Sequence, residues 1–131
     1  MISLCVSLES EIAKLETREK EDFLKELGLN EPAINRLIRA SYALLDLQTF
    51  FTAGPNEVRS WSVKRNSKAP KAAGVIHTDF ERGFIKAEVI AYDDYIKYEG
   101  EQGSKSQGKL RLEGKDYIVK EGDVIYFRFN V

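Results

Sequence analysis

An α+β fold, in which one helix packs on one face of a sheet, is predicted by two features of this 131-residue sequence. Residues 47–64 and several segments after residue 84 alternate apolar and polar side chains with a period of two, which is typical of strands. The stretch between them has a helical period, because apolar side chains recur along one side of it: Ala73, Ile76, Phe80 and Phe84. So short a helix is unstable alone in water, so its apolar side needs the sheet as a partner.

The central helix is predicted within the stretch from Ala69 to Ile85. Pro70 suits the first turn of a helix, where the missing N–H costs no hydrogen bond. Gly83 stands where a left-handed stop is expected. We therefore expect a single helix that ends at Gly83 and lies across the sheet.

The strands on either side of the helix follow from the alternation. Leu47–Ala53 and Val58–Lys64, joined by a turn at Gly54-Pro-Asn56, form a predicted hairpin. Later strands are expected at residues 84–91, 109–113, 117–119 and 124–131. Tyr92–Tyr98 fits either a strand or a helical turn, and the low-complexity stretch Glu99–Gly108 is interpreted as a mobile surface loop. Strand, strand, helix, strand, strand is the order of a ubiquitin-like β-grasp.

Residues 1–46 are predicted to form a separate short helical segment, ahead of the α+β domain at residues 47–131. A short apolar run at the N-terminus is more strand-like than helical, and three stretches with helical periodicity follow it. Thr17 is expected to cap the second helix and Gly28 to end it. Three short helices bury too little to be stable alone, since a core of fewer than about 70 residues contributes only a few kcal/mol. We expect them to dock on a part of the protein that is absent from this chain.

Composition indicates a soluble globular domain, with 43% apolar and 31% charged residues. No apolar run approaches the roughly 20 residues of a membrane span, and the first residues lack the basic start of a secretory signal. The single cysteine, Cys5, excludes an internal disulfide and fits a reducing compartment. We expect a cytoplasmic protein without membrane contact, in which Cys5 acts as a small apolar residue.

Charge is distributed unevenly along the chain. Residues 1–46 carry six Lys and Arg against nine Asp and Glu, a net of −3, and residues 47–131 carry fourteen against twelve, a net of +2. One acid-free stretch holds five cations: Arg59, Lys64, Arg65, Lys68 and Lys71. Basic side chains near aromatic ones such as Trp61 and Tyr126 can contact RNA phosphates and stack on bases. The alternative is a solvated basic face without a ligand, in keeping with the nearly neutral whole chain.

Other candidates for chemistry have simpler structural explanations. His77 is the only histidine and has no nearby cluster of ligands, so a hydrogen-bonded structural histidine is expected. Asp93 and Asp94 are adjacent and would point to opposite faces of a strand, so a turn or a solvated edge is expected. Seven aromatic residues are expected in or near the core rather than in a base-stacking platform: Phe50, Phe51, Trp61, Phe80, Phe84, Phe127 and Phe129. We predict no catalytic residue and no metal site.

Three long strings carry a specific resemblance: LQTFFTAGPNEVRSWSV, APKAAGVIHTDFERGFIKAEVI and GKLRLEGKDYIVKEGDVIYFRFNV. They resemble the C-terminal TGS domain of the YchF (EngD) family of Obg-like ATPases, a domain type also found in threonyl-tRNA synthetases and stringent-response enzymes. Ile76-His77 and Gly122-Asp-Val124 are shared broadly by TGS domains. The strings from Phe50 to Gly54 and from Phe127 to Val131 are similar to YchF in particular.

The resemblance also implies what the remaining residues do. Residues 5–15 and 23–40 are similar to the end of the family's nucleotide-binding domain, which places a remnant of the base-side loop at Cys5, Val6 and Ser7. The TGS helix motif falls on Ile76, His77, Asp79 and Phe80. The family uses ATP or GTP with Mg, but no Gly-x-x-x-x-Gly-Lys-[Ser/Thr] string occurs here to cradle phosphates. We therefore expect no cofactor in this chain and no catalysis by it.

Three functions follow from these observations. The resemblance implies a binding and regulatory module that engages the ribosome or RNA while the missing domain hydrolyses nucleotide. The alternative is a β-grasp protein–protein interaction domain that recruits a partner through a sheet edge or helix face without RNA. The third is that the chain is an enzyme in its own right, which the absence of a phosphate-loop string disfavours. The apolar stripe on residues 8–45 also leaves dimerisation of the chain open.

Overall fold

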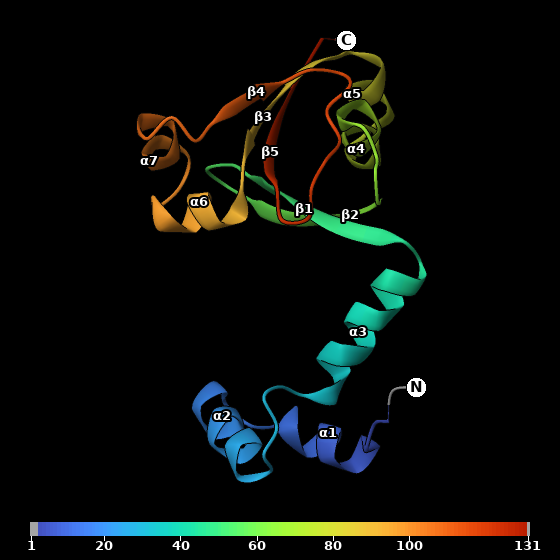
Figure 1. Ribbon diagram of the computed structural model, residues 1–131, viewed down its shortest axis with the longest axis vertical. Helices are drawn as coiled ribbons and strands as arrows, with labels where there is room; N and C mark the ends of the chain where they lie inside the picture. Colours follow the sequence, from blue (N-terminus) through green and yellow to red (C-terminus); the bar gives the residue numbers. More distant parts are fainter. Residues whose placement is uncertain (1–2, 131) are drawn as a thin grey trace. The chain divides into compact units, whose positions relative to one another are not determined.

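The computed structural model describes residues 3–130. These residues belong to two compact units, divided between Leu45 and Asp46. The first, here the helical unit, contains α1 (Val6–Ile12), α2 (Thr17–Glu26) and α3 (Ala33–Leu44) (Figure 1). The second, here the sheet unit, contains five strands and four short helices within the described residues. No helix in residues 3–130 has both the length and the apolar character needed to cross a membrane.

The three helices predicted in the helical unit are present, with shifted ends. α1 already begins at Val6, so the strand-like run predicted at the N-terminus is wrong there, and residues 1 and 2 lie outside the described part of the chain. Thr17 is the first residue of α2 rather than its cap, a role that Glu16 takes. Gly28, with a φ of 65°, lies in the predicted left-handed conformation just after α2.

α3 is capped by a side chain of α1. Pro32 precedes α3 and offers no side-chain cap. Instead, the Glu9 carboxylate accepts hydrogen bonds from the backbone N–H of Ala33 at 2.8 Å and of Ile34 at 3.2 Å. A carboxylate at this end also interacts favourably with the helix dipole. Glu9 therefore ties α1 to α3 across 24 residues of sequence.

The helical unit buries little apolar surface. Its buried apolar residues are Ile12, Leu24 and Ala33. Along α3, by contrast, apolar side chains spaced by three and four residues are 42 to 49% exposed: Ile34, Leu37 and Ile38. The predicted apolar stripe is therefore not covered by the other described residues of its own unit.

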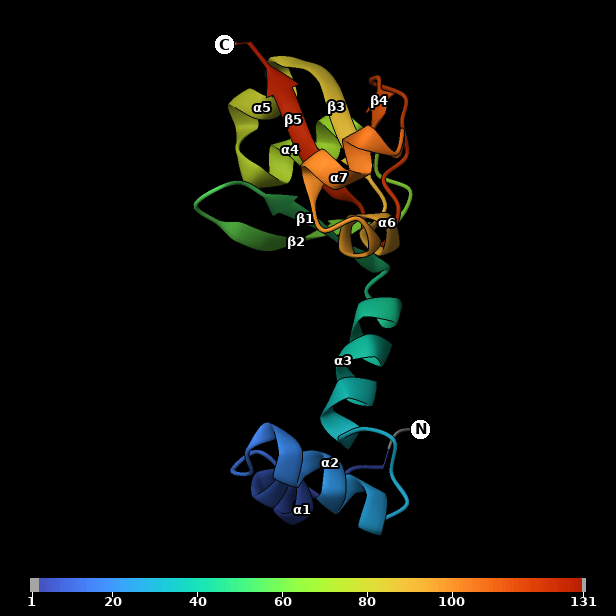
Figure 2. The ribbon, with the colours of Figure 1, turned by 90° about the vertical axis from the view of Figure 1, so that its left-hand side faces the viewer.

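Five strands of the sheet unit form one mixed sheet in the order β2-β1-β5-β3-β4 (Figure 2). Their bounds are Leu47–Ala53 (β1), Val58–Lys64 (β2), Phe84–Ile90 (β3), Arg111–Glu113 (β4) and Val124–Phe129 (β5). β1 and β2 form the predicted hairpin, β3 runs antiparallel to β4 and β5, and β1 is parallel to β5. Val131, predicted in the last strand, lies outside the described residues. The predicted α+β class is confirmed.

Helices α4 (Ala69–Ile76) and α5 (Thr78–Arg82) cover one face of the sheet, and α6 (Tyr92–Lys97) and α7 (Glu101–Ser106) lie on its other side (Figure 1). The core lies under α4. Its buried members are Phe50, Val63, Ala69, Ala72, Ala73, Phe84, Ala87, Val89, Val119, Ile125 and Phe127. Ala87 and Val89 of β3 and Ile125 and Phe127 of β5 belong to this core and alternate with residues on the other face, because successive side chains of a strand point to opposite faces. An irregularity in the pairing with β5 after Phe84 interrupts the alternation in β3.

The prediction of one central helix is wrong, because the chain breaks at His77. The backbone of His77 is extended, with φ −159° and ψ 140°. Its Nδ1 accepts a hydrogen bond from Asp79 N–H at 3.2 Å, which caps α5. Phe84, predicted on the helix, is instead the first residue of β3. Pro70 does lie in the first turn of α4.

Gly83 follows α5 without the predicted left-handed conformation, since its φ is −87°. Glycine is needed there for space. A Cβ at this position would clash with the Asn130 carbonyl oxygen and lie 2.8 Å from the carbonyl carbon. Asn130 N–H also donates to Gly83 O at 2.9 Å. The absent side chain thus allows the end of β5 to approach the start of β3.

The segments after β3 are more helical than the sequence predicts. Tyr92–Tyr98, for which two interpretations were open, contains α6. The predicted mobile loop Glu99–Gly108 contains α7, so that prediction is wrong. Ser104 is fully buried there, and its hydroxyl donates to the Asp94 carbonyl at 3.2 Å. Contacts with the preceding helix therefore order a stretch whose composition is typical of a loop.

Candidate nucleic-acid interface

The five predicted basic residues do not form one patch. Arg59 and Lys64 lie near opposite ends of β2. Five steps of extended strand place their Cα atoms about 16 Å apart. The structure therefore leaves Arg59 near the hairpin turn, whereas Lys64, Arg65 and Lys68 lie at or just beyond the opposite end of β2, and Lys71 lies in the first turn of α4.

The loop between β2 and α4 lies beside the loop between β4 and β5. Val119 N–H donates to Ser67 O at 3.0 Å, next to an isolated antiparallel bridge between Lys68 and Ile118. The strand predicted at residues 117–119 is wrong, since only this bridge forms. Residues paired across such a bridge point their side chains to the same side, so Lys68 and Ile118 both face away from buried Val119.

Two lysines of the second loop extend the basic surface. Lys115 and Lys120 are exposed, and neither was predicted from the sequence. They lie outside the acid-free stretch, because Asp116 and Glu121 are their immediate neighbours in sequence. Only the contact between the two loops brings them close to Lys68. We call the resulting set the two-loop surface: Lys64, Arg65, Lys68, Lys115 and Lys120.

Besides Arg59, which lies 3.9 Å from Glu57, two of the predicted basic residues contact acids. Lys68 Nζ donates to Asp116 Oδ1 at 2.7 Å, and this hydrogen bond together with the lysine charge lowers the pKa of Asp116 below its ordinary value. Lys71 Nζ lies 3.6 Å from Glu81 Oε1. Exposed pairs of this kind contribute little to stability, because water and salt screen them. A phosphate can therefore compete with either carboxylate for its lysine.

A buried network holds the second loop in place. The Asp123 carboxylate is buried and accepts hydrogen bonds from the Tyr117 hydroxyl at 2.6 Å and from Lys120 N–H at 2.9 Å. Arg111 Nη2 lies 3.6 Å from the same carboxylate. Burial, and then the hydrogen bond to Asp123, raise the pKa of Tyr117 to about 12. The network fixes the backbone from which Lys120 extends.

The predicted motif residues Ile76, His77, Asp79 and Phe80 meet at the break between α4 and α5. Phe80 stacks on Phe129 with ring centroids 3.7 Å apart, and the centroid of the His77 ring lies 5.8 Å from that of the Phe80 ring. The motif thus attaches α5 to β5. Within residues 3–130, no group of three or more His, Cys, Asp and Glu side chains is placed to hold a metal ion.

Six of the seven aromatic residues predicted in or near the core divide into two groups, and the seventh, Phe51, is partly buried with its ring centroid 5.9 Å from that of Tyr92. Three are buried: Phe50, Phe84 and Phe127. Three others line an open cleft of about 400 Å³ at the edge of the core: Trp61, Phe80 and Phe129. Phe129 is 36% exposed. The cleft adjoins the motif. Trp61 and Phe80 pack against the core as predicted, and Phe129 is the most exposed of the three.

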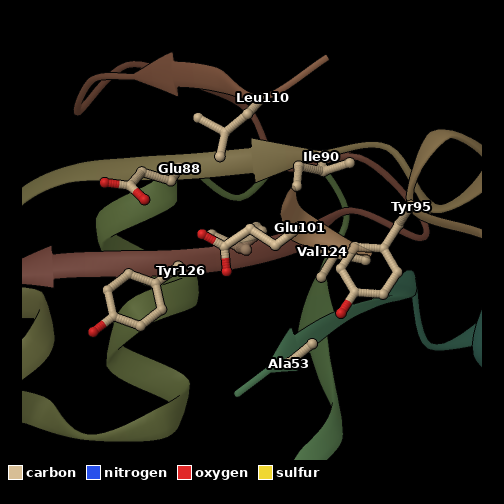
Figure 3. A pocket seen from close by; sticks show the side chains of 9 residues that line it. Ala53, Glu88, Ile90, Tyr95, Glu101, Leu110, Val124 and Tyr126 are labelled. Carbon is tan, nitrogen blue, oxygen red and sulfur yellow. The ribbon is translucent and has the colours of Figure 1, made fainter. Parts of the chain in front are cut away.

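A smaller hollow of about 20 Å³ lies on the other sheet face, between β5 and α7 (Figure 3). The carboxylates of Glu88 and Glu101 lie on the same side of the sheet as the Tyr126 ring (Figure 3). Arg128 Nε donates to Glu88 Oε1 at 3.0 Å. Space of this size holds about one water molecule, so the hollow is too small for an organic ligand.

Comparison with known proteins identifies the family. Residues 47–130 match the family model YchF-GTPase_C, described as "Protein of unknown function (DUF933)". The chain belongs to the YchF family. The family resemblance predicted from the sequence is thereby confirmed.

YchF relatives match the whole chain. Proteins named "Ribosome-binding ATPase YchF" are 63% identical in Haemophilus ducreyi and 57% identical in Bacillus subtilis, over 131 residues that are 100% of this chain and 36% of each relative. "Obg-like ATPase 1" of Gallus gallus is 47% identical over 124 residues, which are 95% of this chain and 31% of that protein. The chain spans about a third of the length of the curated relatives it matches.

Two solved structures share the fold. The YchF GTPase of Schizosaccharomyces pombe matches with a TM-score of 0.83 and 34% identity, over 95% of this chain and 33% of that one. A GTP-binding protein of Pyrococcus horikoshii matches with a TM-score of 0.53 and 19% identity, over 87% of this chain and 29% of that one. The second likeness, at such low identity, concerns the fold alone.

The base-side loop that the YchF resemblance implies lies at the start of α1. Val6 is 73% exposed. The Ser7 hydroxyl lies 3.4 Å from Cys5 Sγ, and this contact lowers the pKa of the thiol. An open hollow of about 340 Å³ adjoins Cys5 and is bounded by Leu8 and Leu29. A role for these residues in nucleotide binding stays a prediction.

Proposed function

We propose that the chain is the binding and regulatory part of a larger YchF-type ATPase or GTPase and contacts the ribosome through RNA. Relatives of which it spans about a third are named ribosome-binding ATPases, which supports a larger ATPase as the parent and the ribosome as the partner. The sequence contains no phosphate-loop string, so nucleotide hydrolysis is assigned to the part of such proteins that this chain does not match. The chain itself acts by binding.

The proposal includes an assignment of the two units. The sheet unit is a TGS domain of β-grasp type, which the strand order β2-β1-β5-β3-β4 and the helices between β2 and β3 support. Residues 1–46 are the end of the nucleotide-binding domain. In longer relatives, the stripe on α3 is covered by the remainder of that domain, since an exposed apolar face of this kind favours a partner. Dimerisation through the same stripe is the competing outcome.

The two-loop surface is the proposed site of RNA contact. The observation that carries the proposal is the backbone bond between Val119 and Ser67, because it places two lysine-bearing loops side by side. The two loops together carry five cations, three from residues 64–68 and two from residues 115–120, and only two acids, Asp116 and Glu121. Such a local excess of cations attracts phosphates, although the whole chain is nearly neutral.

Filter binding of labelled ribosomal RNA at low and moderate salt tests this function. The full chain is compared with Arg65→Glu/Lys68→Glu and with Lys97→Glu/Lys105→Glu, which reverses two charges on α6 and α7. We expect the first variant to bind on the order of tenfold more weakly, with a shallower salt dependence, and the second to bind as the unaltered chain does. No binding at low salt, or equal binding by both variants, would refute the proposal.

A second candidate is a protein-interaction domain that needs no RNA. The observation in its favour is the outer edge of the sheet, where seven-residue β2 has a neighbouring strand on one side only among the described residues, and where Val58 is 73% exposed. An edge of this kind can accept an additional strand. A pull-down from nuclease-treated lysate distinguishes the two: partners retained without RNA favour this candidate.

A further inference from the structure

The sheet is open between β1 and β5. Among the described residues the two strands pair at a single position, Phe51 with Val124. Beyond it the hairpin turns away while β5 continues to Phe129 (Figure 2). From Tyr126 to Phe129, β5 therefore has no strand partner on this side within residues 3–130. The open cleft of about 400 Å³ lies at this gap.

Aromatic and apolar side chains line the cleft from several elements. Ile76 and Phe80 come from α4 and α5, Trp61 from β2, and Phe129 from β5. Tyr126 also lines it, from the other sheet face, since its side chain alternates with those of the core-facing residues of β5. The volume lies within the range of about 300 to 1,000 Å³ that is common for small-molecule sites. The lining suits a flat, largely apolar ring.

An arginine stands over each of two rings that line the cleft. The Arg59 guanidinium carbon lies 4.4 Å from the centroid of the Trp61 ring. The Arg128 guanidinium carbon lies 4.4 Å from the centroid of the Tyr126 ring. Because Trp61 and Tyr126 belong to opposite sheet faces, the two arginines flank the cleft from both faces. Guanidinium groups stacked in this way are well suited to bind phosphate.

The acids near these arginines leave them able to bind an anion. Arg59 Nη1 lies 3.9 Å from Glu57 Oε1, and both side chains are more than half exposed, so the pair contributes little. Arg128 binds Glu88 through Nε. A guanidinium carries five N–H donors, so the Nη groups of Arg128 can donate hydrogen bonds to a second partner. Half of the Arg128 side chain is exposed.

We propose that the cleft binds an unpaired nucleotide of single-stranded RNA, with the base among the aromatic rings and the flanking phosphates on Arg59 and Arg128. This rests on the RNA-binding function proposed above and adds a second contact near the other end of the hairpin. Glu57 also lines the cleft and Glu88 binds Arg128, so a polyanion must share each arginine with a carboxylate. Both arginine side chains are half or more exposed and keep donors available for it, and the apolar interior favours the base that it carries. A base inside a duplex is paired and stacked and is not accessible to the cleft.

Trp61 reports on the cleft directly, because it is the only tryptophan of the chain. The full chain is titrated with a short single-stranded RNA, with the duplex of the same sequence and with an apolar peptide, while tryptophan fluorescence is recorded. We expect the single strand to quench Trp61 fluorescence to saturation, and to do so at concentrations about tenfold lower than the duplex requires.

Two double variants isolate the arginines. Arg59→Gln/Arg128→Gln is expected to weaken single-strand binding about tenfold, because two phosphate contacts are lost. Lys97→Gln/Lys105→Gln removes the same charge from α6 and α7 and is expected to leave binding unchanged. All four side chains are exposed, and thermal melting verifies that both variants fold.

The outcomes separate this inference from the function on which it rests. Single-stranded RNA that binds without changing Trp61 fluorescence, and equally well to Arg59→Gln/Arg128→Gln, overturns the cleft as a site but leaves RNA binding by the two-loop surface intact. A chain that binds neither RNA overturns both. Preferential quenching by the duplex or by the apolar peptide overturns the inference, since the cleft would then take a different occupant.

Discussion

At Gly83, space rather than backbone conformation determines the residue. A methyl group there would meet the Asn130 carbonyl, so Gly83→Ala must displace the end of β5. We expect a loss of about 1 to 3 kcal/mol in the free energy of unfolding, as for overpacked sites. Urea unfolding followed by circular dichroism measures it. Gly114→Ala is the control, since a Cβ there meets nothing within 4 Å; equal losses in the two variants would contradict the explanation.

Tyr117 is expected to link stability to alkaline pH. Its pKa rises from the ordinary value of 10.0 to about 12 in the folded chain, through burial and then the hydrogen bond to Asp123. The folded state therefore keeps the proton to higher pH than the unfolded chain does. The corresponding stability is complete below about pH 10 and is lost as the pH rises through about 12.

Tyr117→Phe removes this hydroxyl and tests the link. At pH 7 we expect a loss of about 1 to 3 kcal/mol, because the buried carboxylate of Asp123 loses a donor. Between about pH 10 and 12, the free energy of unfolding should fall more steeply in the unaltered chain than in the variant. Urea unfolding across this pH range measures both slopes, and parallel slopes would show that Tyr117 does not carry the effect.

Single residues were predictable from sequence where local chemistry decides. Pro70 in a first helical turn and Gly28 at a left-handed stop follow from conformational preference alone. Gly83 and His77 do not. The reason for Gly83 is a carbonyl 47 residues later in the chain, and His77 breaks the helix because its ring caps the next one. Distant contacts of this kind leave no local signal.

At the scale of elements, the cap that Glu9 provides for α3 can be tested by substitution. Glu9→Ala removes both acceptors of the Ala33 and Ile34 N–H groups. We expect a loss of about 1 kcal/mol from the helical unit, the usual value for a lost cap. Thermal loss of ellipticity at 222 nm measures it.

The matched control for Glu9 lies on the same helix. Glu11→Ala removes the same charge from an exposed position of α1, and it is expected to change stability by no more than about 0.5 kcal/mol. Glu9→Gln, which retains one acceptor oxygen, should be intermediate. Indistinguishable melting of all three variants would exclude the capping role.

Elements with strong periodicity were predicted well. The hairpin strands have the predicted bounds, Leu47–Ala53 and Val58–Lys64, because alternation and a Gly-Pro-Asn turn act together. The central helix and the stretch Glu99–Gly108 were predicted wrongly. In the central helix, the apolar period continues across the break at His77. In Glu99–Gly108, the polar composition gives no sign that the Ser104 hydroxyl is buried and hydrogen-bonded. Periodicity indicates burial without showing where the backbone bends.

At the scale of the whole chain, the two units are expected to differ in autonomy. Every buried member of the core cluster lies between residues 50 and 127, so residues 46–131 alone should unfold cooperatively and give a well-dispersed NMR spectrum. Residues 1–45 alone should lose most helicity, because so small a core contributes only a few kcal/mol. Circular dichroism of both pieces tests this; a disordered 46–131 piece would contradict it.

The family could be recognised from sequence strings, whereas the two-loop surface could not. Residues 64–68 and 115–120 lie about fifty positions apart, and their proximity depends on the bridge between Lys68 and Ile118. The acid-free run also predicted one basic patch that includes Arg59, but β2 places Arg59 at the opposite end of the hairpin from the two-loop surface. In both cases, distance along the sequence was a poor guide to distance in the folded chain.

The central claim, that the sheet unit contacts the ribosome through the two-loop surface, is tested most directly by sedimentation with purified ribosomes. The full chain, the variant Arg65→Glu/Lys68→Glu/Lys120→Glu and the control Lys86→Glu/Lys97→Glu/Lys105→Glu are compared at moderate salt. The claim predicts that the full chain and the control sediment with ribosomes, while the variant binds at least about tenfold more weakly. Equal sedimentation of all three proteins, or none by the full chain, would contradict it.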